Sequence, residues 1–175
     1  MDPDVLNDFR DEFGYAVKES YFDSNESMLS TLKEANVVQD LIIPSDYTVS
    51  KMIDENMLEK LDYSKIPNAA NIDPRFKNKI FDPDGKYYDY AVPYMWGTVG
   101  ILYNKKMVSE TVDSWDILFD KKYQKQVIML DSERDTMMVA LKKLGYSANE
   151  TDPAKLNEAK ELLIRQKKDG IVKGY

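Results

Sequence analysis

The chain has 175 residues, a formal net charge of −7, and neither histidine nor cysteine. This length is sufficient for one core or two modest lobes. The absence of the two residue types excludes thiol nucleophiles, Cys/His zinc sites and Ser-His triads within the chain. The acidic balance argues against a nucleic-acid-binding protein, whose binding face is basic, and gives weak support to a cationic ligand.

The first 60 residues alternate between helix-like and strand-like patterns. Apolar residues recur at helical spacing in some segments, and in others they alternate or run together before a proline. In chain order, the patterns predict a helix over 4–13, a strand over 15–21, a helix capped by Ser24 and Asn25, a strand over 40–43 and a helix over 48–55. This alternation is typical of a mainly parallel sheet with covering helices and indicates an α/β fold.

The middle and the second half of the chain differ from each other. Residues 62–90 are rich in proline, asparagine and tyrosine and predict a long ordered loop, in which DPDG (82–85) is a turn rather than a calcium loop. Beyond that loop, the patterns predict a strand over 91–103, a short helix over 114–119, a strand over 126–130, a helix over 134–144, a helix from 153 to about 167 and a strand that starts at 171. Trp115 is expected in the core.

Six stretches of the sequence carry a resemblance to a known family. They are FDSNESMLSTLK (22–33), DLIIPSDYTVSKM (40–52), LDYSKIPNAANIDPRFKN (61–78), VPYMWGTVGILYN (92–104), SWDILFDKKY (114–123) and DSERDTMMVALKKLGYSANETDPAKLNEAKELL (131–163). Each is weak alone, but the ordered set covers nearly the whole chain. Together they resemble the polyamine-binding branch of the type II periplasmic binding proteins, which are the spermidine/putrescine receptors of ABC importers.

The resemblance implies an α/β fold like that of the type II periplasmic binding proteins, with two lobes and a mainly parallel sheet. On that map, residues 1–104 belong to the first lobe and residues 105–175 begin the second. The family's opening Asn-Trp-x-Glu-Tyr motif and much of its second lobe have no counterpart here, so we expect an incomplete fold. Exposed sheet edges would then allow the chain to form a dimer.

The resemblance also implies a function. Such a protein captures a polyamine between its lobes and delivers it to ABC permease subunits in the membrane. It is not an enzyme, it has no cofactor or metal, and it does not bind nucleic acid. Its location would be periplasmic, or extracellular with a lipid anchor.

The chemistry of a polyamine predicts what its site must contain. Each ammonium group needs carboxylates or carbonyls, and the methylene groups need flat apolar or aromatic walls. PSDY (44–47) follows a predicted strand, where ligands bind in open α/β sheets, so Ser45 and Tyr47 are candidate ligand contacts. The structural alternative is a turn in which Ser45 caps a helix and Tyr47 packs.

A second pair of candidates lies in DSERD (131–135), also between a predicted strand and a helix. By resemblance, Asp135 matches an acidic ligand-binding position, and Ser132 stands where some relatives have an aspartate. The structural alternative is the ordinary acidity of a helix N-terminus. Tyr94 and Trp96 could form a wall of the cleft, but packing in the core or hinge is the favoured interpretation.

Two other functions stay open at this point. A related binding protein could take a cationic amino acid or Fe(III), for which Tyr87, Tyr88 and Tyr90 are imaginable ligands. A carboxylate-pair hydrolase is less favoured, since acidic residues are abundant but none lies in a motif that specifies a role.

Overall fold

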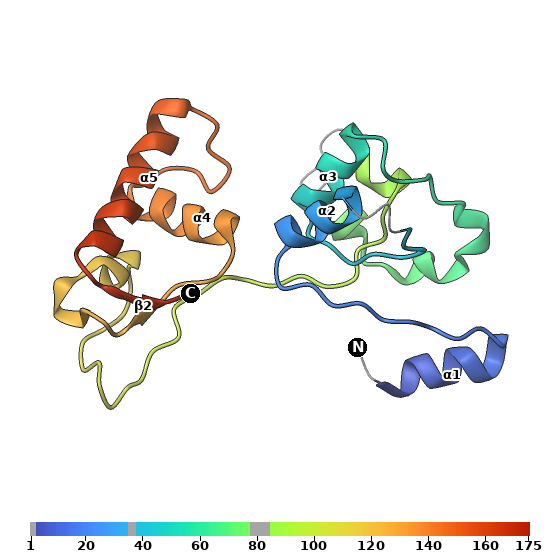
Figure 1. Cartoon of the computed structure of the whole chain (residues 1–175), viewed down its shortest axis with the longest axis horizontal. Helices are drawn as coiled ribbons and strands as arrows, with labels where there is room; N and C mark the ends of the chain where they lie inside the picture. Colours follow the sequence, from blue (N-terminus) through green and yellow to red (C-terminus); the bar gives the residue numbers. More distant parts are fainter. Residues whose placement is uncertain (1–2, 35–37, 78–84) are drawn as a thin grey trace. The chain divides into compact units, whose positions relative to one another are not determined.

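The structure is a computed structural model that describes residues 3–34, 38–77 and 85–175 (Figure 1). The chain divides into two compact units, Met1–Tyr94 and Met95–Tyr175, and each is described by itself. The lobe boundary predicted at residue 104 stays a prediction. None of the helices in the described ranges is both long and apolar enough to cross a membrane.

The first unit contains three α-helices: α1 (Pro3–Phe13), α2 (Asn25–Glu34) and α3 (Asp46–Asp54). The helix predicted over 4–13 is confirmed, and it ends at Gly14, whose φ of +76° a side chain would disfavour. The helix predicted over 48–55 begins two residues earlier. Met28, Leu29 and Met52 bring α2 and α3 together as the buried core of this unit.

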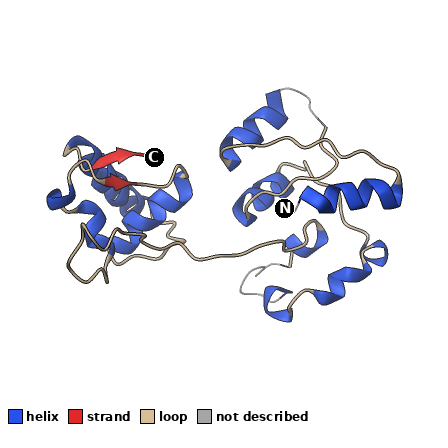
Figure 2. Cartoon of the chain, turned by 90° about the horizontal axis from the view of Figure 1, so that it is seen from below, coloured by secondary structure: helices blue, strands red, loops and turns tan. Residues whose placement is uncertain are grey.

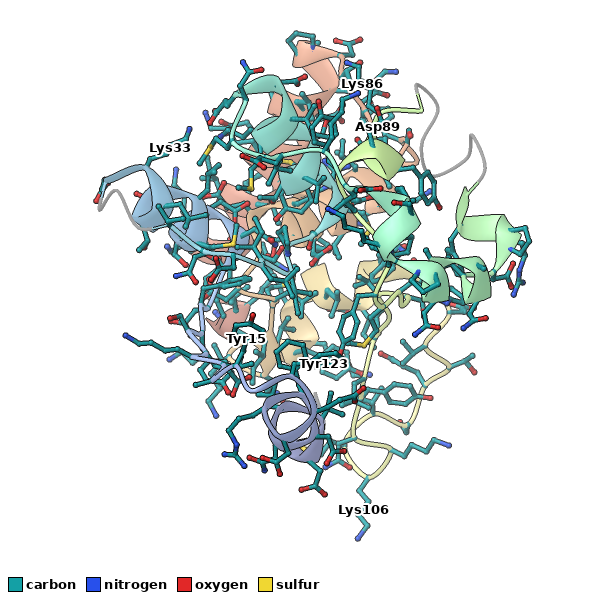
Figure 3. All side chains as sticks on the ribbon, turned by 90° about the vertical axis from the view of Figure 1, so that its right-hand side faces the viewer. Tyr15, Lys33, Lys86, Asp89, Lys106 and Tyr123 are labelled. Carbon is teal, nitrogen blue, oxygen red and sulfur yellow. The ribbon has the colours of Figure 1, made fainter. Side chains whose placement is uncertain are left out.

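Within the segment predicted as a long ordered loop, the described residues 62–77 and 85–90 contain short 3₁₀ helices. Their bounds are η1 (Tyr63–Lys65), η2 (Pro67–Asn71), η3 (Pro74–Lys77) and η4 (Tyr87–Asp89). Asp89, labelled in Figure 3, holds η4 against the preceding segment, because it pairs with Lys60 over 2.6 Å. Residues 82–84 of the predicted DPDG turn lie outside the described residues.

The strands predicted over 15–21, 40–43 and 91–103 are wrong. These segments are loop in the structure, and the sequence colours of Figure 1 show them as plain tube without strand arrows. A strand forms when another strand takes up its backbone N–H and C=O groups, and within the described residues no strand pairs with these segments. Several of their apolar side chains stay exposed, by 86% at Tyr21, 78% at Leu41 and 100% at Leu102.

The second unit has its own sequence of elements. They are η5 (Trp115–Phe119), η6 (Lys121–Tyr123), β1 (Val127–Ile128), α4 (Glu133–Lys143), α5 (Pro153–Lys168) and β2 (Val172–Gly174). The predicted short helix at 114–119 is confirmed as a 3₁₀ helix, and Ser114 caps it by accepting the Asp116 N–H over 3.1 Å. The predicted helices at 134–144 and from 153 are also confirmed.

The two strands form a small parallel sheet, drawn as neighbouring red arrows in Figure 2. Val127 pairs with Val172, and Ile128 pairs with Gly174 after a register irregularity. The connection between the strands passes through α4 and α5, so this unit has the order strand, helices, strand that the sequence predicted. Since parallel strands need such a crossover, the pattern is that of an α/β fold.

The core of the second unit lies between the sheet and the two helices. Ala140 of α4 and Ala159 of α5 are completely buried and pack in one cluster with Leu141. A second cluster is built on Val127 and Ile171, and the half-buried Trp115 packs against it, as predicted. Small residues on both helices allow close approach and so position the start of α4, where two predicted site residues lie.

Candidate functional site

Ser45 and Tyr47 lie at the start of α3, after the segment predicted as a strand. Ser45 occupies the N-cap position, and its main-chain carbonyl accepts from the N–H groups of Thr48 and Val49 over 3.0 and 3.1 Å. Its hydroxyl does not cap the helix. Ser45 thus occupies the cap position of a helix, as the structural alternative expects, but it caps through its main chain and not through its hydroxyl.

Asn25, the first residue of α2, joins the beginnings of the two helices. Its Oδ1 accepts the Ser45 N–H over 2.9 Å. Its Nδ2 donates to the Ser45 Oγ over 3.1 Å and to the Tyr47 hydroxyl over 3.0 Å. Because the backbone N–H can only donate, Oδ1 must face it and the NH₂ group must face the two hydroxyls. One amide thus fixes the positions of both candidate residues.

Tyr47 also contacts a carboxylate. Its half-buried hydroxyl donates to the Oε1 of Glu26 over 3.1 Å. The pKa of Tyr47 is raised above its ordinary value, first by burial and then by the hydrogen bond to Glu26 and the charge of that residue. Tyr47 therefore remains a neutral phenol at physiological pH.

The surroundings of this phenol are acidic. Glu26 lies in the first turn of α2, and Asp46 lies in the first turn of α3, where its Oδ1 accepts the Tyr47 N–H over 2.8 Å. A helix N-terminus carries about half a positive charge. Two formal negative charges outweigh the helix ends, so this corner of the first unit favours a cation.

Ser132 and Asp135 lie at the start of α4, just after β1. Ser132 is the N-cap residue, and its Oγ accepts the Asp135 N–H over 3.3 Å. Ser132 therefore caps α4 through its side chain, a role that was not predicted for it. Asp135 is half-buried in the first turn of the helix, an acidic position that the helix dipole favours.

The turn before α4 is held by its neighbours. Thr136 donates from Oγ1 to the main-chain oxygen of Leu130 over 2.8 Å. Arg134 donates to the Oδ1 of Asn149 over 2.8 Å. The first bond fixes the path between β1 and α4, and the second ties the start of α4 to the segment between α4 and α5.

The structure therefore brings the predicted residues together as two pairs. Ser45 and Tyr47 belong to the first unit, and Ser132 and Asp135 belong to the second. Contact of any of the four with a ligand remains a prediction. The cleft-wall hypothesis for Tyr94 and Trp96, which are 56% and 68% exposed on either side of the division between the units, also stays untested.

Other parts of the described structure offer less to a charged ligand. A hollow beside η1 and η2 is lined by Tyr63, Ile66, Pro67, Ala69, Ala70 and Tyr88. No carboxylate lines it, so it cannot neutralise an amine. Across the described residues, no group of three acidic, histidine or cysteine side chains is placed to hold a metal ion.

Sequence reasoning missed Asn25 and Glu26 as members of this site. Ser24 and Asn25 were both predicted to cap α2, and Ser24 is the residue that does so, since its Oγ accepts the Ser27 N–H over 3.1 Å. This leaves Asn25 available for Ser45 and Tyr47. The local sequence SNE (24–26) gives no signal for this role, because an asparagine at this place is equally compatible with a helix cap.

Comparison with known proteins gives a consistent result. The sequence profile of the family described as bacterial extracellular solute-binding protein matches residues 4–175. The spermidine/putrescine-binding periplasmic protein of Salmonella typhimurium is 40% identical over 163 residues, which cover 92% of this chain and 46% of that protein. The chain thus spans about half the length of the curated relatives that it matches.

Solved structures agree in fold. A putative spermidine/putrescine ABC transporter protein from Listeria monocytogenes matches with a TM-score of 0.89 and 39% identity, over 99% of this chain and 53% of that one. The TpPotD lipoprotein of Treponema pallidum matches with a TM-score of 0.85 and 32% identity, over 97% and 52% of the two chains. The predicted α/β fold of the type II periplasmic binding proteins is confirmed by this likeness. The chain belongs to the family of bacterial extracellular solute-binding proteins.

Proposed function

We propose that this chain is part of the solute-binding component of a polyamine ABC importer, and that it captures spermidine or putrescine without changing it chemically. The observation that carries the proposal is the phenol of Tyr47, held between Asn25 and the carboxylate of Glu26. Similarity to proteins named for spermidine and putrescine supports it.

The chemistry of this corner suits one end of a polyamine. An ammonium group requires acceptors and a negative charge, which the Tyr47 oxygen and Glu26 provide. The aromatic ring of Tyr47 adds a flat face for methylene groups and attraction for the cation.

The second unit offers a further acid for the same ligand. Asp135 is half-buried at the start of α4 and would receive another ammonium group of the ligand.

The partners and the location follow from the same proposal. The loaded protein would deliver its ligand to permease subunits in the membrane. It would act outside the cytoplasmic membrane, in the periplasm or on a lipid anchor, because one relative is named periplasmic and another is named a lipoprotein.

Calorimetric titration of the protein at its full natural length tests the proposal. We expect saturable heat with spermidine or putrescine, and weaker binding by Tyr47→Phe and by Asp135→Asn. Glu161→Gln, at an exposed position on α5, is a matched control that should keep the original affinity. Absence of heat with both polyamines, together with heat from arginine or ferric citrate, would replace the assignment with another solute. Hydrolytic turnover of a substrate would overturn the non-enzymatic role.

A further inference from the structure

The hydroxyl of Tyr47 lies between a group that can only donate and a group that, when ionised, can only accept. The Asn25 NH₂ donates to it over 3.0 Å, and the hydroxyl donates to Glu26 over 3.1 Å. The single proton of the hydroxyl is therefore committed to Glu26.

This arrangement determines what a ligand can do at the Tyr47 oxygen. A ligand group that bonds to this oxygen must donate, because the proton is engaged with Glu26. An ammonium group carries three N–H donors and no acceptor, so it matches. A carboxylate or phosphate would find no proton and would face the charge of Glu26.

The second contribution of Glu26 is its charge. Its carboxylate is half-buried, so it is less screened than a charge in open water. A cation bound at the Tyr47 oxygen would lie close to this carboxylate through the hydroxyl that joins them. Hydrogen-bond polarity and charge thus select the same class of ligand.

We propose that Glu26, held beside Asn25 at the start of α2, is a positioning residue that makes Tyr47 an acceptor for an ammonium group and so selects cations at this end of the site. The inference rests on the proposed function, since it names the chemistry of one part of the same site. Ser45 also forms two hydrogen bonds with the Asn25 amide, and these bonds hold the starts of α2 and α3 together.

Binding measurements on substituted proteins test this role. Glu26→Gln keeps the size and an acceptor oxygen but removes the charge, and we expect spermidine affinity to fall about tenfold, as for loss of a charged hydrogen-bond partner. Glu34→Gln, at the other end of α2, is the matched control and should leave the affinity unchanged. In a Tyr47→Phe background, Glu26→Gln should add less than about a twofold loss, since residues that act as one unit are not additive.

A second measurement needs no ligand. With tyrosine labelled by ¹³C at Cζ, nuclear magnetic resonance titration follows the pKa of the Tyr47 phenol, whose signal is assigned by its loss in Tyr47→Phe. Glu26→Gln should lower this pKa, because the present hydrogen bond and negative charge both raise it.

The outcomes separate the inference from the proposed function. If the unsubstituted protein binds no polyamine, the proposed function fails, and with it the ligand preference assigned to Glu26. If it binds but Glu26→Gln matches Glu34→Gln, or keeps its full effect in the Tyr47→Phe background, the inference alone is overturned. An unchanged Tyr47 pKa in Glu26→Gln also overturns it, whether or not polyamines bind.

Discussion

Gln166 of α5 donates a hydrogen bond from its Nε2 to the main-chain oxygen of Leu118, over 2.7 Å. Gln166 is only 3% exposed, and the same Nε2 lies 3.7 Å from the sulfur of Met129. A buried amide in apolar surroundings thus attaches α5 to η5. The attachment therefore fixes α5 and η5, against which β1 and α4 pack.

Replacement of this amide should destabilise the second unit. Gln166→Leu leaves the Leu118 carbonyl without its donor, and we expect a loss of about 1–3 kcal/mol in the free energy of unfolding. Urea unfolding followed by circular dichroism measures it. The control is Gln124→Leu. It removes an exposed hydrogen bond of the same length, 2.7 Å, from the Gln124 Nε2 to the main-chain oxygen of Asp169. Equal losses in the two variants would contradict the importance of burial.

The contact between α4 and α5 should reject a larger side chain. Ala159 is completely buried, so Ala159→Leu overpacks the cluster with Ala140, and we expect a loss of about 1–3 kcal/mol. Ala154→Leu, on the exposed first turn of the same helix, should change stability little. Thermal unfolding of both variants gives the comparison. Unchanged stability in Ala159→Leu would contradict close packing between α4 and α5.

Substitution of Ser132 can separate its capping role from ligand binding. Ser132→Ala removes the side-chain acceptor for the Asp135 N–H and should cost about 1 kcal/mol. Ser132→Asp restores a good cap, so most of that stability should return. If this position faces a polyamine, the added charge should also tighten spermidine binding about two- to fivefold. Thermal unfolding and calorimetry on both variants measure the two effects, and unchanged affinity in Ser132→Asp would remove this residue from the site.

Acid should weaken a link between η6 and the loop before it. The pKa of Glu110 is lowered from its ordinary value of 4.5, first by the hydrogen bond from Lys122 and then by that from Tyr123. A carboxylate with a lowered folded-state pKa stabilises the fold above its unfolded-state pKa, and this stability is lost as pH falls through the folded-state value. We therefore expect Glu110→Gln to melt below the unsubstituted protein at pH 7, with the gap closing in acid below about pH 4.5.

The melting temperature, measured at several pH values from 7 to 3, checks this course. Lys122→Gln removes the largest cause of the shift and should reproduce most of the change seen with Glu110→Gln. A gap that does not depend on pH would show that Glu110 acts by packing and not by charge.

Exposed apolar loops should promote self-association of the 175-residue chain. Leu41 and Leu102 lie in segments where, in the described structure, no strand pairs with the backbone. Such segments can form strands with a second copy, so we expect the apparent mass from light scattering to rise with concentration. Leu41→Ser with Leu102→Ser should reduce this rise. Val5→Ser, on the helix α1, is the control and should not.

Helices were predictable from the sequence because their signals are local. Gly14 ends α1, Ser114 begins η5, and Asp152 caps α5 by accepting the Ala154 N–H over 2.9 Å. Each signal acts within a few residues of the helix end. The predicted strands depended on distant partners instead, and three of these segments lack such partners in the described structure.

The candidate site was predictable only in part, for a similar reason. Ser45 and Tyr47 stand in a motif that a family resemblance can point to. The roles of Asn25 and Glu26 arise from contacts across about twenty positions of sequence, between residues 25–26 and 45–47. Nothing in the local pattern distinguishes an amide that caps its own helix from one that reaches the next.

Lys106 is drawn at the tip of a turn in Figure 3, where the N–H groups of Met107 and Val108 both donate to the carbonyl of Asn104 over 2.9 Å. Asn104 also accepts the Lys106 N–H with its side chain, over 2.9 Å. The turn is thus organised by one asparagine, as is the contact between the starts of α2 and α3. Asparagine fixes both places through a group that carries no charge.

This choice has a consequence at Asn25. Its amide carries no formal charge, so the bonds from Asn25 fix Ser45 and Tyr47 while the negative charge of this corner comes from Glu26 and Asp46. In this corner of the protein, a neutral residue sets the geometry and other residues supply the charge. Replacement of the Glu26 carboxylate by an amide would therefore change the charge that this corner presents and leave the hydrogen bonds of Asn25 in place.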